Sequence, residues 1–318
     1  MNLLFLSSDP ISIPCLEALA QGEIEGVKVA GVVSNPDRRK GRGKRMQRNP
    51  VAELAEKFGI PVLQTPKLTA SDLAEFVDFD TALVFAFGQI LSRKILAMKP
   101  DRFLNLHTSP LPLLRGPSPI ETAIALGWTE TKVCLMRLVF AMDKGAVGGR
   151  ETVIIERTDT GTSLREKMSK ASVRLLSQIA PEKFPEISWQ EQNHHEATYC
   201  RKLRKEDSLI DFSLTSEEIV NRSRAFLAWP GTSFCIGNET IRVADLEIEE
   251  PSGQPGQVLE TKDRLIIATG DSSISIGQLQ RPTRKMLPYA SSQGSLPFRI
   301  GDRLSFTLSK PLVRKSHS

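Results

Sequence analysis

Residues 103–116 read FLNLHTSPLPLLRG, an apolar run that ends at a histidine and leads into a turn with two prolines and a glycine. A short apolar run bounded by turn residues is typical of a strand buried on both faces of a sheet. His107 ends this predicted strand, and the other histidines are His194, His195 and His317. Because ligands bind beyond the carboxyl ends of the strands in an open parallel sheet, we expect His107 at a binding edge.

Similar apolar runs recur on both sides of this segment and alternate with helical patterns. The predicted strands are residues 3–7, 27–34, 61–64, 81–87, 103–107, 133–140 and 151–156. The predicted helices are residues 13–22, 51–59 and 162–180. Apolar strands that alternate with helices are typical of a parallel sheet covered on both faces. We therefore predict an α/β domain with a Rossmann-like, mostly parallel sheet.

The pattern changes in the second half of the chain. Residues 190–208 are polar and lack sustained periodicity, so we predict a linker there. A short predicted helix at 215–228 is followed by short strand patterns separated by Gly, Asn and Asp turns. These predicted strands are residues 232–237, 239–248, 256–260, 264–270, 273–280 and 302–308. Such strands suit an OB-like β-barrel, which divides the chain into domains at 1–189 and 209–318.

The net charge of +5 is concentrated in one short segment, residues 37–48, DRRKGRGKRMQR. Its seven basic residues outweigh the single acidic one, so the rest of the chain is close to neutral. The basic residues are Arg38, Arg39, Lys40, Arg42, Lys44, Arg45 and Arg48. Such a segment gains affinity for phosphates by releasing counterions, which predicts contact with a nucleic acid. A solvated surface loop is the alternative, because charge runs are usually exposed.

The remaining composition favours an ordinary intracellular protein. The four cysteines are scattered without a CxxC pair or a paired Cys/His spacing, so we expect reduced thiols and no metal. No apolar run approaches the ~20 residues that cross a bilayer. The start of the chain lacks the basic region of a signal peptide. We therefore expect a cytoplasmic monomer that does not bind a membrane.

The predicted strand 103–107 places two functional side chains together. Strand alternation puts Asn105 and His107 on the same face, about 6–7 Å apart. An imidazole exchanges protons near neutral pH, and an amide NH₂ can donate to a developing oxyanion. Asp143 follows the predicted strand 133–140, and in a parallel sheet it could orient the imidazole. The pattern alone also allows an ordinary polar histidine, and the chain has neither GxSxG nor GxGxxG.

These residues also carry a resemblance. NLHTSPLPLLRG, followed by AMDKG, resembles the formyltetrahydrofolate-dependent formyltransferases, whose signature is N-x-H-x-S-L-L-P-x-x-R-G with a later G-x-D-x-G. The basic segment, AFGQIL, ATYCRKLRKEDSLIDFSL and RAFLAWPGTSF are similar to the branch of that family that acts on initiator methionyl-tRNA. The similar blocks run in order over most of the chain.

The resemblance implies formyl transfer from 10-formyltetrahydrofolate, a co-substrate, to the α-amine of methionyl-tRNA through a tetrahedral intermediate, without a metal. It implies a catalytic role for Asn105, His107 and Asp143, and it makes the domain at 209–318 tRNA-binding. Arg42 corresponds to an arginine that reaches the tRNA acceptor end. The residues implied to contact the folate are Phe87, Gly88, Gln89, Ile90, Leu91, Ser109, Pro110, Leu111 and Pro112.

The sequence departs from the family pattern at several positions. The first turn reads SSDPIS, SPLP replaces SLLP, and Phe87, Ala141 and Ala146 stand where tyrosine, glycine and an acidic residue are usual. Two other functions stay open, an N-formyltransferase for an amino sugar nucleotide and a non-catalytic tRNA-binding paralogue. A glycinamide ribonucleotide formyltransferase would end near residue 200. His194 and His195 are expected to have no role, and Asp37 is expected to be a turn residue.

Overall fold

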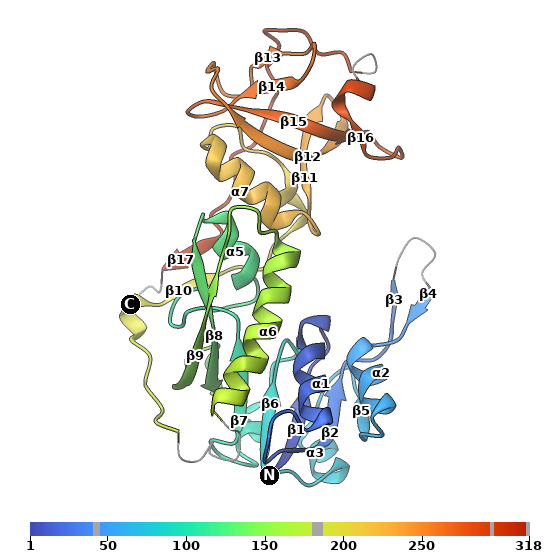
Figure 1. The fold of residues 1–318 in the computed structure, drawn as a ribbon, viewed down its shortest axis with the longest axis vertical. Coiled ribbons are helices and arrows are strands. Elements are labelled where there is room, and N and C mark those ends of the chain that lie inside the picture. Colours follow the sequence, from blue (N-terminus) through green and yellow to red (C-terminus); the bar gives the residue numbers. More distant parts are fainter. Residues whose placement is uncertain (41–44, 180–186, 293–295, 316–318) are drawn as a thin grey trace.

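The computed structural model describes residues 1–40, 45–179, 187–292 and 296–315, and these ranges form two units, one above the other in Figure 1. Two of the predicted basic contacts, Arg42 and Lys44, lie outside the described residues. None of the helices in the described ranges is long and apolar enough to cross a membrane.

A seven-stranded sheet forms the first unit. Its strands in spatial order are β5 (Val62–Gln64), β2 (Lys28–Ser34), β1 (Asn2–Leu6), β6 (Thr81–Val84), β7 (Phe103–His107), β8 (Glu130–Arg137) and β9 (Val147–Ile154). The strands from β5 to β7 are parallel. β8 is antiparallel to β7, and β9 is antiparallel to β8. The mostly parallel, Rossmann-like sheet is therefore confirmed, with one reversed strand, β8, between β7 and the edge strand β9.

Helices cover both faces of this sheet, and the alternating side chains of β1 show it. Leu3 and Phe5 point into one core, whereas Leu4 and Leu6 belong to a second. The first core includes α1 (Ile13–Gln21), α2 (Pro50–Lys57), α5 (Pro119–Ala125) and α6 (Gly161–Ile179), and the second includes α3 (Ala70–Phe76) and α4 (Arg93–Leu96). Gly22 ends α1 in the left-handed conformation at φ +77°, as a helix-terminal glycine commonly does.

The strand order changes direction beside β1. From β1 the chain runs outward to β2 and β5, and it then returns to β6 on the other side of β1. The loops that follow β1 and β6 therefore diverge, which opens the carboxyl edge of the sheet at this point. A short antiparallel hairpin, β3 (Arg38–Lys40) and β4 (Arg45–Gln47), follows β2. It projects from the carboxyl edge on the side where the second unit lies (Figure 1).

The second unit has its own core and an antiparallel sheet, as expected of an OB-like domain. Its elements are α7 (Ser216–Phe226), β11 (Thr232–Ile236), β12 (Glu239–Glu249), β13 (Val258–Glu260), β14 (Leu265–Ala268), β15 (Ser273–Gln280) and β16 (Leu287–Pro288). The sheet order is β11-β12-β15-β14-β13, with β16 beside β15, so the sheet forms a half-barrel. α7 packs between this sheet and α5 of the first unit.

The strand predicted at 302–308 is wrong. This segment is extended, and its first residues bond to the start of β13 around one bridge between Gln257 and Arg303, but the pairing does not continue into a strand. Leu304 and Phe306 still pack on the core of the second unit. Alternate apolar residues therefore face the core as they would in a strand, and the pattern does not reveal that the pairing stops after the first residues.

The segment predicted as a linker, residues 190–208, carries structure of its own. It contains β10 (Thr198–Cys200), which pairs antiparallel with β17 (Val313–Lys315), the last strand among the described residues. Arg115 of the first unit donates its backbone N–H to the Thr198 carbonyl at 2.9 Å. This segment therefore packs on the first unit, while the domain boundaries at 189 and 208 stay predictions.

Candidate active site

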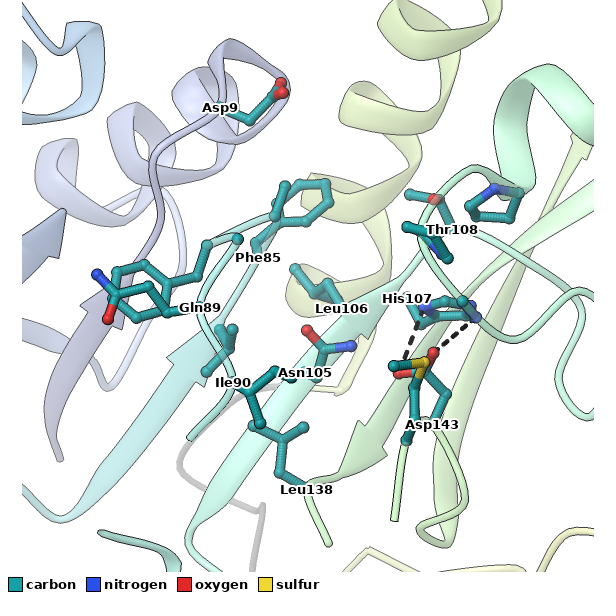
Figure 2. A pocket seen from close by; sticks show the side chains of 18 of the residues that line it. Asp9, Phe85, Gln89, Ile90, Asn105, Leu106, His107, Thr108, Leu138 and Asp143 are labelled. Carbon is teal, nitrogen blue, oxygen red and sulfur yellow. Dashed lines mark hydrogen bonds and ion pairs between the residues drawn. The ribbon is translucent and has the colours of Figure 1, made fainter. Parts of the chain in front are cut away.

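One cavity of about 540 Å³ lies at the carboxyl edge of the parallel strands, beside the point where the strand order changes (Figure 2). Its volume falls within the range of small-molecule and cofactor sites. The loops after β1 and β6, the end of β7 and the loop after β8 form its walls. Its lining is made of Asp9, Ile11, residues 84–91, Leu96, residues 105–108, Gly116, Pro117, Pro119, Ile120, Glu121, Leu138, Val139, Phe140, Met142, Asp143 and Arg165.

The three predicted catalytic residues meet in this cavity. Asn105 and His107 project from the same face of β7, as strand alternation predicts, and Asp143 lies opposite His107 (Figure 2). His107 is only 7% exposed, and its Nδ1 is 4.0 Å from Asp143 Oδ1. Its Nε2 lies 3.3 Å from the Leu114 carbonyl oxygen. Both ring nitrogens therefore face oxygen acceptors, the Leu114 carbonyl within hydrogen-bond distance and the Asp143 carboxylate beyond it.

Asp143 reaches His107 by a route that the parallel-sheet hypothesis did not foresee. Because β8 is antiparallel to β7, its carboxyl end lies at the opposite edge of the sheet from His107. The loop after β8 folds back over the sheet, and Asp143 sits in it at φ +52°. Gly145 allows this return, since a Cβ there would lie 1.9 Å from the Arg137 carbonyl oxygen. The placement of Asp143 near His107 was expected, but the structural reason given for it was wrong.

The loop after β6, residues 85–91, is held by the buried side chain of Asn35. Asn35 Nδ2 donates to the Phe87 carbonyl at 2.9 Å, and its Oδ1 accepts from Gln89 Nε2 at 2.9 Å. Gln89 also donates to the Thr65 carbonyl and accepts the Leu68 N–H. The Asn35 and Gln89 side chains together therefore fix the shape of the loop. Ile90, which is 82% exposed, lines the cavity.

The other residues predicted to contact the folate, residues 109–112, lie outside the cavity lining. Residues 109–112 follow His107, but none of them lines the cavity. Ser109 is buried and donates to the Leu113 carbonyl at 2.7 Å, and Leu111 packs with Met136 and Val147 in a small core. This turn therefore supports the end of β7 from behind. The cavity wall on that side comes instead from Gly116 and the start of α5.

The buried thiols near the site are poor nucleophiles. Burial raises the pKa of Cys134, which pairs with His107 across the sheet, to about 11. Burial also raises the pKa of Cys200 to about 11. Both sulfurs are therefore neutral thiols at physiological pH, and thiolate chemistry is not available at these two positions.

The basic hairpin β3–β4 presents its arginines to solvent. Arg38, Arg39 and Arg45 are exposed, and none has an acidic partner within the described residues. Arg48 instead pairs with Glu56 at 2.5 Å. Asp37 closes the base of the hairpin. The hydrogen bonds that it accepts from Gln64 and the Asn49 N–H hold its pKa below the usual value.

Comparison with known proteins settles the family. Residues 1–180 match the formyl transferase model, and residues 202–293 match the model for the formyl transferase C-terminal domain. The chain belongs to the formyl transferase family. Within this family it is 35% identical to a methionyl-tRNA formyltransferase of Acidiphilium cryptum, over 96% of this chain and 100% of the relative. It is 34% identical to that of Bacillus subtilis, over 90% and 92%.

Among solved structures, the family fold recurs in an N-formyltransferase from Helicobacter canadensis in complex with folinic acid and dTDP-3-aminofucose. The TM-score is 0.66, the identity is 18%, and the match covers 88% of this chain and 98% of the other. At this identity the likeness shows the fold alone. The protein is therefore a formyltransferase by family, with a Rossmann-like first unit and a half-barrel second unit.

Several residues around the site were missed by the sequence analysis. Arg115 is fully buried, and it donates to Gln192 and to Nδ1 of His194, which was expected to have no role. A charged residue inside a signature motif could have signalled a buried partner. Asn35 and Gln192 gave no such signal, because the hydrogen bonds of the Asn35 side chain reach residues at least 52 positions away and those of the Gln192 side chain at least 47.

Proposed function

We propose that the protein transfers the formyl group of 10-formyltetrahydrofolate to the α-amine of initiator methionyl-tRNA. One observation carries this proposal: the same sheet edge holds Asn105, His107 and Asp143 in a cavity and extends a hairpin of exposed arginines. The cavity suits the chemistry of formyl transfer, and the hairpin suits a nucleic-acid acceptor. The two relatives named methionyl-tRNA formyltransferase match along nine-tenths or more of this chain, which supports the choice of acceptor.

In the proposed reaction, the free amine attacks the formyl carbon and produces a tetrahedral oxyanion. The Asn105 NH₂ and an N–H of His107 stabilise this oxygen, because preorganised donors stabilise charge as it develops. The nitrogen of the attacking amine loses a proton, and the departing folate nitrogen gains one when its bond to carbon breaks. His107 carries this proton, and Asp143 orients the ring and stabilises its protonated form.

The His107–Asp143 distance bears on how the pair would act in the proposed reaction. At 4.0 Å the two atoms are farther apart than in a hydrogen bond. Catalytic hydrogen bonds are often long in the free enzyme and shorten in the complex with substrate. We expect this pair to shorten when both substrates are bound.

We assign the donor to the cavity beside the loop 85–91. Its residues Phe87, Gly88, Gln89, Ile90 and Leu91 line the cavity next to Asn105, so a folate here would place its formyl group near the amide. Folinic acid, itself a formylated tetrahydrofolate, is bound by the Helicobacter canadensis protein of the same fold. Ser109, Pro110, Leu111 and Pro112 do not line the cavity, so we propose that they act on the folate site indirectly, by supporting the end of β7.

We assign the acceptor to the hairpin side of the cavity. Arg38, Arg39 and Arg45 are exposed there, and Lys40, Arg42, Lys44 and Arg48 belong to the same basic segment. The second unit lies on the same side and offers a second surface along which a tRNA could extend (Figure 1). We further propose that the protein acts as a monomer in the cytoplasm.

The main alternative is an amino sugar nucleotide as acceptor, because the Helicobacter canadensis structure of the same fold holds dTDP-3-aminofucose. The arginine hairpin favours tRNA, since a small nucleotide does not need it. A non-catalytic tRNA-binding protein is the other alternative, and the complete catalytic trio argues against it.

The deciding experiment supplies purified protein with 10-formyltetrahydrofolate and one of three acceptors: methionyl-tRNA, uncharged tRNA or a dTDP-amino sugar. We expect formylmethionyl-tRNA and no product from uncharged tRNA, which lacks the amine. Formylation of the amino sugar alone would replace the proposed acceptor. Binding of tRNA without any product would support the non-catalytic alternative.

A further inference from the structure

The Gln192 side chain is hydrogen-bonded to the loop that carries Asp143. The side chain is buried at 6% exposure, and its Nε2 donates to the backbone carbonyls of Asp143 and Gly145 at 2.9 and 2.7 Å. A primary amide has two N–H groups, and both are used here. The two carbonyls flank the turn in which Asp143 adopts φ +52°, a conformation unfavourable for a residue other than glycine. Such a conformation persists only where surrounding contacts hold it.

Arg115 sets the orientation of the Gln192 amide group. Its guanidinium is completely buried, and Nε and Nη2 donate to Gln192 Oε1 at 3.1 and 2.7 Å. Two more of its N–H groups reach the Tyr199 hydroxyl and His194 Nδ1, so none of these partners is a carboxylate. Because the oxygen of Gln192 is occupied by Arg115, its NH₂ group must point at the Asp143 loop.

The same segment also holds the other acceptor beside His107. Thr198 Oγ1 accepts the Leu114 N–H at 2.9 Å, and Leu114 adopts φ +51°. The Leu114 carbonyl is the oxygen that lies 3.3 Å from His107 Nε2. Residues 192–198 therefore fix both groups that the imidazole faces, one through Gln192 and the other through Thr198.

We infer that Gln192 is a positioning residue of the active site, which holds the Asp143 carboxylate against His107 under the control of Arg115. This inference rests on the proposed function, since it takes His107 and Asp143 as catalytic. Gln192 does not line the cavity, so it acts only through the loop. Its role differs from general support of the fold, because its amide contacts that turn and not the hydrophobic core.

The substitution Gln192→Glu separates positioning from support. It keeps the shape and gives Arg115 a carboxylate partner, but it places oxygen against the Asp143 and Gly145 carbonyls where N–H groups stood. We expect kcat to fall at least ~10-fold with KM changed less than ~3-fold, because small displacements of catalytic groups cost about this much or more. We expect the Tm to stay near that of the parent or to rise.

Gln190→Glu is the matched control. It is the same substitution two residues away, on an exposed side chain that accepts from Arg150 and does not touch the Asp143 loop. Its kcat and KM should equal those of the parent. Gln192→Met, which keeps the volume and removes every hydrogen bond, provides a second variant and should also lose kcat.

A double-mutant cycle tests whether Gln192 acts through Asp143. In the Asp143→Asn background, Gln192→Glu should reduce kcat by less than ~2-fold, since the carboxylate that it positions is already gone. Equal losses in both backgrounds, or parent-like kcat in both Gln192 variants, would overturn the inference.

Hydrogen exchange keeps this test separate from the identity of the acceptor. Backbone amides of residues 138–146 should exchange at least ~10-fold faster in Gln192→Glu than in the parent or in Gln190→Glu. Unchanged exchange in this loop would overturn the inference even if methionyl-tRNA is formylated. Failure of the parent protein to formylate methionyl-tRNA would instead contradict the proposed function, while faster exchange would still support the positioning of the loop.

Discussion

The carboxylate of Asp143 lies 4.0 Å from the His107 imidazole, although the strands that lead to the two residues run in opposite directions. The approach depends on a loop that folds back and is anchored at its turn, where the second oxygen of Asp143 accepts the Gly116 N–H at 2.8 Å. The pair is therefore built by tertiary contacts and not by the sheet alone. This makes the chemistry of the site separable from the stability of the sheet by mutation.

Removal of either proposed oxyanion donor should abolish most of the turnover. We expect Asn105→Ala and His107→Ala each to lose at least ~100-fold in kcat, because one donor of this kind contributes roughly 10²–10³ in rate. Single-turnover formyl transfer measures the effect, and circular dichroism checks the fold. Asn105→Asp keeps the shape without the NH₂ donor and should be as inactive as Asn105→Ala. Near-parental rates in these variants would refute the assignment.

The hairpin arginines should govern affinity for tRNA. We expect Arg39→Ala to raise the KM for methionyl-tRNA and to reduce the slope of log affinity against log salt by up to about 1, as loss of one phosphate contact does. Arg48→Ala should have a smaller effect, because Arg48 already pairs with Glu56. Titration at several salt concentrations checks this order. An equal slope in the parent and in Arg39→Ala would contradict the proposed contact.

Asn35 should control the donor site through the loop 85–91. Asn35→Ala removes the bonds to Phe87 and Gln89 and leaves a buried carbonyl without its donor, which costs about 1–3 kcal/mol of unfolding free energy. We expect a raised KM for 10-formyltetrahydrofolate with a smaller change in kcat. Gln64→Ala is the control, since Gln64 bonds to the Asn35 carbonyl and Asp37 but not to this loop. A donor KM that is equal in both variants would argue against this role.

Asp207 should make the stability of the fold sensitive to acid. Burial favours a raised pKa, but two hydrogen bonds from Arg201, at 2.7 and 2.5 Å, and one from the Arg204 N–H lower the pKa below its ordinary 3.8. A carboxyl with a lowered folded-state pKa stabilises the protein above its unfolded pKa, about 4, and this contribution is lost as pH falls through the folded-state pKa.

We therefore expect Asp207→Asn to lower the free energy of unfolding by about 2 kcal/mol at neutral pH, the size of hydrogen bonds to a charged group. The difference from the parent should shrink as pH falls below about 4, where the parent carboxyl itself takes up a proton. Urea denaturation across this range measures it. Asp263→Asn, at an exposed site, is the control and should match the parent throughout. A difference that is independent of pH would assign the effect to something other than the charge.

The sequence predicted the sheet because its strands are continuous apolar runs, and it predicted that Asn105 and His107 share a face because strands alternate. It did not reveal that β8 is reversed, since a buried strand has the same apolar pattern in either direction. Nor could it reveal Gln192 or Asn35, whose partners are distant in the chain and become neighbours only after the fold is complete. Periodicity reports burial, and it does not report which backbone carbonyl a buried amide meets.

The pairing of β10 with β17 makes the second unit an insertion between two adjacent strands. The chain leaves the first unit after Cys200 and comes back at Val313, so the half-barrel is attached by two crossings that lie side by side. A unit held at two points cannot swing as freely as one on a single tether. The position of the half-barrel relative to the arginine hairpin is therefore restricted, and under the proposed function this fixed spacing would favour nucleic acids whose length and curvature match it.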